Sequence, residues 1–442
     1  MKLRSILVLG VYGCVISSRL FGVESDSYDL RNVAGSSFVS AVKSQQGGTC
    51  WTHAAMAAIE SNLMMTGNWV AGGESGEPDL AEYHLDWWNG FNKNNNADIA
   101  PRTGGLTVHE GGDYRVAAAY LALGGGAVRN RDGQSYSSAP AKNADSYRHY
   151  YVRDIEWFTV GTDLAKIDKI NAIIRDHGVM GTALAWSSSF YSSGLNSFYQ
   201  PTSSSAAPNH AVSIVGWDDA RVTQASRPGA WLIKNSWGTS WGSSGYFWIS
   251  YYDKVAGVHR EMGAVSMQNV EPLQYSHIYS HDYHGWRATK TDAFEAFNAF
   301  TAAGSPSGVE SLKSVSFYSV AEQVEYEISV YADFRDGNLE QLLSQKIGTL
   351  ENTGFHTVDL DAEVDLVAGQ KFYVALRLSH GGHAYDTTSD VPVLLGGTNT
   401  RVIVESFAGP GQSYYRTADG WVDLQSFDGM ANFSIKGLSV TH

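Results

Sequence analysis

Residues 45–63 read QQGGTCWTHAAMAAIESNL, a loop with two glycines followed by a run whose apolar residues recur three and four positions apart. This spacing predicts an amphipathic helix from Cys50 to Met65. Cys50 would then be the first helical residue, where unpaired backbone N–H groups and the helix dipole favour a negative charge. Because the thiolate is the reactive form of cysteine, this position favours a nucleophile over a buried structural thiol.

The other cysteine of the chain, Cys14, lies in a segment typical of a signal peptide. Met1–Arg4 is basic, and an uncharged apolar run follows it as far as Ser18. We therefore predict a signal peptide over residues 1–22 and a secreted or cell-envelope protein; acylation of Cys14 as a lipoprotein anchor is the alternative. Cleavage leaves Cys50 without a disulfide partner. No second long apolar segment follows, so we expect no integral membrane segment after cleavage.

The composition is that of an ordered protein with more than one domain. Hydrophobic residues make up 43% and charged residues 17% of the 442 residues, which is enough apolar material for large cores. The net charge of -14 argues against nucleic acid or anionic lipid as a main partner, because both require clustered lysine and arginine.

The pattern of predicted elements changes along the chain. Helical spacing recurs at Tyr114–Leu123 and Leu164–His177. Beyond residue 267 short alternating segments are separated by Gly, Asp and Ser turns, which predicts a β sandwich. We therefore expect an α+β domain over residues 23–266 and an all-β domain over residues 267–442. The strands expected in the first domain are Val179–Trp186, Ala211–Trp217, Trp231–Asn235 and Tyr246–Tyr252.

Two further blocks carry side chains that a cysteine nucleophile needs. Residues 209–217 read NHAVSIVGW and place His210 at the start of an apolar strand, and residues 231–238 read WLIKNSWG. A thiolate nucleophile requires an imidazole that pairs with it and later protonates the leaving amine. It also requires a group that orients the imidazole and donors for the oxyanion. His210 and Asn235 are candidates for the first two tasks.

Taken in order, the glutamine loop with Cys50 and Trp51, the block at 209–217 and the block at 231–238 resemble the papain family of cysteine peptidases. The resemblance covers residues 26–266. It implies a two-lobed fold, with a helical lobe and a β-barrel-like lobe. It also implies an enzyme that needs no cofactor. By this resemblance Cys50 is the nucleophile, His210 the acid and base, and Asn235 the group that orients His210.

The same resemblance implies roles for five neighbouring residues. Trp237 would shield the bond between the imidazole and the amide from water. Gln45, with Gln46 as the alternative, would complete the oxyanion hole together with the backbone N–H of the nucleophile. Gly111 and Gly112 resemble the segment whose bare backbone pairs with an extended substrate, although an ordinary turn before a helix is the alternative.

The C-terminal part has a resemblance of its own. Residues 275–279, YSHIY, and the strands as far as Leu378 look like the lectin-like β domain that is fused to bacterial and archaeal members of this family. A glycan or cell-surface ligand is therefore a possible partner of this domain. A lectin-like fold does not by itself establish sugar binding.

Four features depart from the family pattern. Gly47 stands where the family has a second cysteine, and the loop before the nucleophile is one residue short. His53 replaces an aromatic residue; it either fills that buried position or tunes the pKa of the thiol. After signal cleavage the chain would begin close to Asp29–Arg31, so we expect no long inhibitory propeptide.

The sequence thus predicts an exported cysteine endopeptidase that cleaves protein or peptide substrates through a thioester. Two rivals are an inactive adhesin or glycan-binding protein and a cell-wall amidase or transpeptidase with the same triad.

We predict no metal site, because no cysteine framework accompanies the histidines. In the C-terminal half, acidic residues occur at every second position of one segment. We expect this segment to be a strand with a solvated face, not a calcium-binding loop. The residues weighed for these sites are His277, His281, His284, His380 and His383, and Asp359, Asp361, Glu363 and Asp365.

Overall fold

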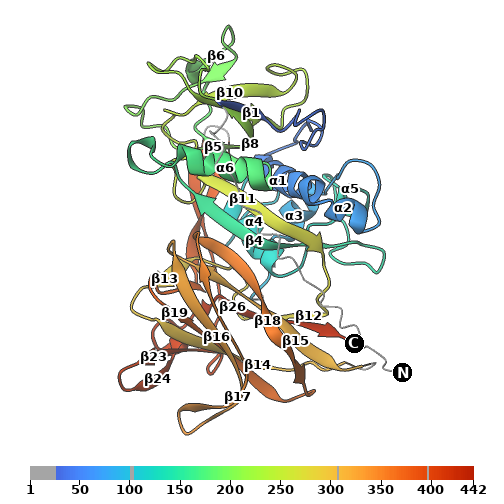
Figure 1. Cartoon of the computed structure of the whole chain (residues 1–442), viewed down its shortest axis with the longest axis vertical. Helices are drawn as coiled ribbons and strands as arrows, with labels where there is room; N and C mark the ends of the chain where they lie inside the picture. Colours follow the sequence, from blue (N-terminus) through green and yellow to red (C-terminus); the bar gives the residue numbers. More distant parts are fainter. Residues whose placement is uncertain (1–25, 100–103, 306–307, 396–397) are drawn as a thin grey trace, which may run out of the picture.

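The computed structural model describes residues 26–99, 104–305, 308–395 and 398–442 and consists of two parts stacked along the long axis (Figure 1). The N-terminal part contains the helices α1 to α6, and the C-terminal part consists almost entirely of strands. The predicted class, an α+β unit with two lobes followed by a β sandwich, is confirmed. The predicted signal peptide and Cys14 lie outside the described residues.

Helix α1 (Cys50–Thr66) runs through the middle of the N-terminal part and begins at the predicted residue. It ends at Gly67, whose φ of 73° is the left-handed conformation that terminates many helices. Fourteen of its 17 residues are buried, so the expectation of one apolar and one polar face is wrong. The reason is that three strands and four helices pack against α1, which leaves only its last turn at the surface.

The other helices are shorter. Helix α4 begins as predicted, because Asp113 caps it by accepting the N–H of Val116 at 2.7 Å. The remaining helices and 3-10 turns are α2 (Asn68–Ala71), α3 (Glu82–Trp88), α4 (Tyr114–Ala122), α5 (Asn130–Gly133), α6 (Ile167–His177), η1 (Thr162–Leu164), η2 (Ser188–Phe190) and η3 (Leu424–Ser426).

The β lobe is built around two antiparallel strands that carry the second and third sequence blocks, β8 (His210–Asp218) and β9 (Ala230–Lys234). All four strands predicted for this region are present. The sheet continues on both sides of the central pair in the order β4-β11-β5-β8-β9-β10-β7-β6, with β1 paired to β8. These strands are β1 (Ser27–Asp29), β4 (Tyr150–Phe158), β5 (Met180–Leu184), β6 (Tyr191–Ser192), β7 (Ser197–Phe198), β10 (Tyr246–Ser250) and β11 (Ala264–Pro272), and a separate pair is β2 (Phe91–Asn92) with β3 (Asn95–Asn96).

The C-terminal part is a sandwich of two large sheets, beside which β13, β20 and β25 form a small third sheet. One large sheet has the order β17-β16-β19-β14-β23-β24, and the other is formed by β12, β26, β15 and β18. Phe317, Val330 and Leu376 from both sheets belong to the core between them. The strands are β12 (His277–Tyr279), β13 (Ala288–Lys290), β14 (Glu295–Thr301), β15 (Glu310–Ser319), β16 (Val324–Arg335), β17 (Asn338–Leu350), β18 (Gly354–Leu366), β19 (Lys371–Leu378), β20 (His383–Asp386), β23 (Ser413–Thr417), β24 (Gly420–Asp423), β25 (Asn432–Phe433) and β26 (Ile435–Thr441).

The two parts share one sheet. Strand β18 pairs with β4 through Gly354–His356 and Asp154–Glu156, so the sheet of the β lobe continues into the sandwich as 13 strands. The boundary predicted between residues 266 and 267 lies inside β11, and it stays a prediction.

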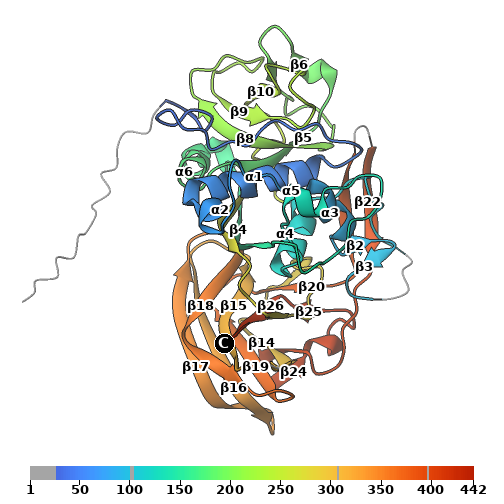
Figure 2. The same ribbon diagram turned by 90° about the vertical axis from the view of Figure 1, so that its right-hand side faces the viewer.

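One hairpin leaves the sandwich and lies along the N-terminal part. It consists of β21 (Ser389–Leu395) and β22 (Thr398–Val404), which form a two-stranded sheet of their own. Figure 2 shows β22 beside α3, β2 and β3 and away from the other C-terminal strands. Val391 and Val404 are fully buried in the core cluster that contains α1.

Candidate active site

Cys50 combines a helix N-terminus with complete burial. Its side chain carries a free thiol and is 2% exposed. Burial raises the pKa of this thiol to about 11, although backbone N–H groups of Ala211 and Trp51 act in the opposite direction. The thiol is therefore protonated at neutral pH in this conformation, and its Sγ lies 4.0 Å from the carbonyl oxygen of Leu394, to which it donates.

His210 is held in one tautomer by Asn235. The Oδ1 atom of Asn235 accepts the backbone N–H of Ser236 at 2.8 Å, which identifies that atom as oxygen. The Nε2 atom of His210 lies 2.9 Å from the same oxygen and must donate to it. The neutral ring therefore keeps its lone pair on Nδ1. Burial lowers the pKa of His210 to about 4, while the bond to Asn235 acts in the opposite direction.

Trp237 covers the imidazole. Its ring is stacked on that of His210 with centroids 4.5 Å apart and an interplanar angle of 20°. Trp186 and Trp241 meet Trp237 edge-on at 4.9 Å and 5.1 Å. The stacking of Trp237 on His210 is compatible with the shielding that the resemblance implies, which stays a prediction.

The two glutamines of the loop differ in their environment. The side chain of Gln45 accepts the hydroxyl of Ser236 at 2.6 Å and donates to the carbonyl of Gly47 at 2.8 Å. Gln46 is exposed, and its backbone N–H donates to the hydroxyl of Tyr83. Gln45 is thus tied to the residue that follows Asn235, whereas the side chain of Gln46 is directed to solvent.

Gly111 and Gly112 are both sites of close approach. A Cβ on Gly112 would lie 2.6 Å from the ring of Trp51, next to Cys50. Gly111 has a φ of 113°, and a Cβ there would lie 2.7 Å from the side chain of Val393 and 2.9 Å from the backbone nitrogen of Leu394. The bare backbone at Gly111 therefore contacts another stretch of extended chain, which belongs to the hairpin.

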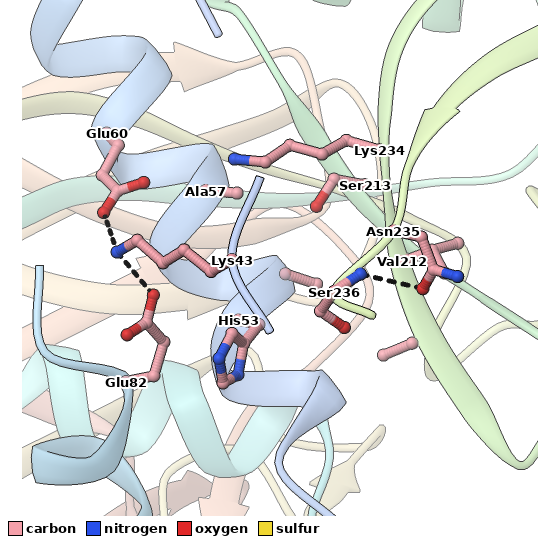
Figure 3. Close-up of a pocket in the computed structure, with 12 residues that line it drawn as sticks. Lys43, His53, Ala57, Glu60, Glu82, Val212, Ser213, Lys234, Asn235 and Ser236 are labelled. Carbon is pink, nitrogen blue, oxygen red and sulfur yellow. Dashed lines mark hydrogen bonds and ion pairs between the residues drawn. The ribbon is translucent and has the colours of Figure 1, made fainter. Parts of the chain in front are cut away.

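A buried polar cluster lies behind these residues, and sequence reasoning missed it. Figure 3 shows the ammonium group of Lys43 between Glu60 and Glu82, with distances of 2.9 Å and 2.7 Å. Burial alone would lower the pKa of Lys43, but the carboxylates of Glu60, Glu82 and Asp79 raise it above its ordinary value. Lys234 lies 2.9 Å from the hydroxyl of Ser40, and burial lowers its pKa. Glu60, a charged residue inside an otherwise apolar helical run, was the available signal.

His53 lines the same pocket (Figure 3). Its Nδ1–H donates to the carbonyl of Thr49 at 2.9 Å, and its ring meets that of Tyr83 edge-on. Burial lowers the pKa of His53, and a charge on it would in turn lower the pKa of His210. His53 is thus buried and hydrogen-bonded, as expected for a residue that fills the position of an aromatic.

Among the described residues, one group could hold a metal ion. Asp98, His284 and Asp386 place ligand atoms within 4.8 Å of one another. Both ring nitrogens of His284 already have partners, the hydroxyl of Ser406 at 2.7 Å and the carbonyl of Gly90 at 3.1 Å. The other four histidines weighed from the sequence are not in this group. Asp359, Asp361, Glu363 and Asp365 are exposed on β18, as predicted.

Two protein families match separate parts of the chain. Residues 92–266 match the family described as "Papain family cysteine protease", a stretch that contains His210 and Asn235 and begins after Cys50. Residues 278–439 match the family described as "Lectin like domain".

Curated relatives align with the N-terminal part. Procathepsin L of Rattus norvegicus is 28% identical over 216 residues, which are 48% of this chain and 57% of that protein. A probable cysteine protease of Arabidopsis thaliana, RD19B, is 26% identical over 233 residues, which are 52% of this chain and 59% of that protein. The chain spans less than two thirds of the length of either relative.

A solved structure is similar over nearly the whole chain. The clostridial cysteine protease Cwp84 after propeptide cleavage has a TM-score of 0.74 at 23% identity, covering 95% of this chain and 100% of that one. The cysteine protease and lectin-like domains of Cwp84, described as a surface layer associated protein of Clostridium difficile, give a TM-score of 0.73 at the same identity. At this identity the likeness establishes a common fold.

No helix in the described ranges is long and apolar enough to cross a membrane.

Proposed function

Since the chain joins a papain family cysteine protease domain to a lectin-like domain, we propose that it is an exported endopeptidase with Cys50, His210 and Asn235 as its catalytic triad. The observation that carries this proposal is the pairing of His210 with Asn235 under the ring of Trp237, on a strand whose next backbone N–H, that of Ala211, acts on the sulfur of Cys50. A buried structural thiol would need none of these partners.

In the proposed reaction the Nδ1 atom of His210 takes the proton of Cys50, and the sulfur attacks the carbonyl carbon of a peptide. A C–S bond forms and the oxyanion develops, stabilised by the side-chain amide of Gln45 and the backbone N–H of Cys50. The C–N bond breaks as His210 returns the proton to the leaving amine. Water, deprotonated by His210, then hydrolyses the thioester and releases the acid.

Asn235 is assigned an orienting role. Because its oxygen is directed by the N–H of Ser236, it accepts only from a protonated Nε2, and it thereby keeps Nδ1 available for the sulfur.

The proposal also concerns location and partners. A signal peptide would export the chain, and the likeness to a surface layer associated protease makes the cell envelope a reasonable destination. Proteins or peptides would be the substrates, bound along the backbone at Gly111. A glycan or another cell-surface ligand is proposed for the lectin-like domain.

The test is hydrolysis of a fluorogenic peptide library under reducing conditions by the full chain and by Cys50→Ala. We expect cleavage by the first and none by the second, with a thioester trapped and located on Cys50 by mass spectrometry. Residual cleavage in Cys50→Ala equal to that of the unchanged protein would refute the mechanism.

The rival functions have their own readouts. A cell-wall amidase or transpeptidase would act on peptidoglycan fragments and leave the peptide library intact. An inactive adhesin would bind glycans on an array and form no thioester with any peptide. Both measurements use the same preparation as the peptide assay, so a positive result in either of them identifies the rival.

A further inference from the structure

The nucleophile is covered by the C-terminal domain. The carbonyl oxygen of Leu394, which is 344 positions away in the chain, accepts the thiol of Cys50. Leu394 is 1% exposed and Val393 is 6% exposed, although both belong to a hairpin that is no part of the sandwich. Their burial comes from the peptidase domain, because they belong to the core cluster that contains Cys50 and Trp51.

The hairpin takes the place expected for substrate. Gly111 contacts Val393 and the backbone of Leu394 so closely that any side chain at this glycine would clash. Strand β21 also lies against β8, the strand that begins with His210. One extended segment therefore contacts the substrate-binding backbone, the nucleophile and the strand of the general base. An extended peptide substrate would need the same three contacts.

Polar contacts at its base hold the hairpin in this position. Arg287 donates to the hydroxyl of Ser389 at 2.9 Å and to the carbonyl of Asp390 at 3.1 Å, where β21 begins. On β22, Arg401 lies 3.5 Å from the carboxylate of Glu261 in the peptidase domain. Arg287 comes from the C-terminal part and Glu261 from the N-terminal part, so the hairpin is fastened to both.

We propose that the β21–β22 hairpin is an intramolecular occupant of the active site, so that the chain is latent until the hairpin leaves. Substrate and hairpin exclude one another, because Val393 and Leu394 fill the groove at Gly111 and Cys50. The inference rests on the proposed function, because only that function identifies the groove as the substrate site. The contacts of the hairpin with Gly111 and Cys50 do not depend on it.

The electrostatics of the covered state agree with latency. Burial raises the pKa of Cys50 and lowers that of His210, so a thiolate and an imidazolium are both disfavoured beneath the hairpin. Departure of the hairpin would return water to the sulfur and the ring. The same event would therefore open the groove and favour the reactive ion pair.

A pair of matched substitutions tests the contact. Val393→Asp places a charge in the groove, whereas Ile403→Asp places the same charge on the outer face of the hairpin, where the side chain is 51% exposed. The readout is the rate at which iodoacetamide labels Cys50 in the native full chain, measured by mass spectrometry of the Cys50 peptide. If about 1% of molecules are open, Val393→Asp should label up to about a hundredfold faster, and Ile403→Asp at the unchanged rate.

A shortened hairpin keeps the test valid if Val393→Asp fails to fold. Asp390 pairs directly with Ile403, so residues 391–402 can be replaced by Asn-Gly, which suits a two-residue turn between antiparallel strands. We expect this variant to label fast and to cleave peptides faster than the unchanged chain.

The outcomes separate the two proposals. Fast labelling of the shortened variant without cleavage of any peptide would support the hairpin inference and remove the peptidase function. Equal labelling rates in all four proteins would overturn the hairpin inference, and cleavage by all four would leave the peptidase function intact. An inactive unchanged chain therefore counts against the peptidase only if the shortened variant is inactive too.

Discussion

Asn235 is positioned by its neighbour in the sequence. Its Oδ1 accepts the N–H of Ser236 and the Nε2–H of His210, so the amide cannot turn over without losing one of these bonds. Ser236 in turn donates its hydroxyl to Gln45. Ser236 thus contacts both Asn235 and the loop in front of Cys50, which would align the two residues proposed to orient His210 and to stabilise the oxyanion.

Gln45→Ala should lower kcat by about a hundredfold or more, since an oxyanion-hole donor stabilises charge that is present only in the transition state. Gln46→Ala is the matched control, because its exposed side chain makes no contact with Ser236. Peptide hydrolysis by the shortened-hairpin variant gives kcat and KM for both. A loss in Gln46→Ala and none in Gln45→Ala would assign the donor to the other glutamine.

At this scale, local motifs were predictable and distant contacts were not. The blocks around Cys50, His210 and Asn235 each have a local pattern that points to chemistry, and the structure brings the second and third into direct contact. Leu394 has no such pattern. Its contact with Cys50 depends on how two domains are placed, and neither composition nor periodicity carries that information.

At the scale of elements, Lys43 connects the loop before Cys50 to two helices. Its ammonium group pairs with Glu60 on α1 and Glu82 on α3, whose side chains are both 1% exposed. Two carboxylates at this depth need a cation, since an unpaired buried charge is strongly destabilising. The cluster therefore holds the nucleophile loop against the helical lobe.

Lys43→Met should lower the free energy of unfolding by about 3–5 kcal/mol, because it leaves the buried carboxylates of Glu60 and Glu82 without the ammonium group that pairs with both of them. The control is Lys166→Met, which breaks a pair with Glu322 in which both side chains are more than 40% exposed, and which should change stability by less than about 1 kcal/mol. Urea unfolding of both variants measures the difference. If Lys43→Met and Lys166→Met unfold at the same urea concentration, the ion pairs of Lys43 add nothing to stability.

The sequence predicted a helix or strand correctly where its apolar residues keep one spacing over many positions. Helix α1 began where expected, yet its burial on all sides did not follow from its spacing, since the packing of three strands and four helices around it is decided elsewhere in the chain. The hairpin shows the same limit. The alternating segments beyond residue 267 were all assigned to a β sandwich, whereas the structure places β21 and β22 against the N-terminal part.

At the scale of the molecule, two sequence domains form one continuous body. Strands β4 and β18 pair across the junction, and Arg153 reaches from β4 to the carboxylate of Asp359 at 2.8 Å. Phe355 and Tyr318 of the sandwich belong to the same core cluster as Ile155 of the peptidase domain. The sequence resembles two families side by side, but the energetic unit includes both.

This arrangement predicts a single unfolding transition. Scanning calorimetry of the full chain should give one peak, with calorimetric and van't Hoff enthalpies in agreement. Phe355→Ala at the junction should cost about 3–5 kcal/mol, and Leu376→Ala inside the sandwich about 2–5 kcal/mol. Both side chains are at most 1% exposed.

The two variants distinguish a coupled body from two linked domains. If the shared sheet couples the parts, Phe355→Ala and Leu376→Ala each shift the whole peak, and the proposed cleavage of peptides is lost at the same temperature as the sandwich. If instead Leu376→Ala splits the trace and moves only one component, the parts unfold independently. In that case the hairpin would be the main link between the domains, and shortening it should separate the two components further.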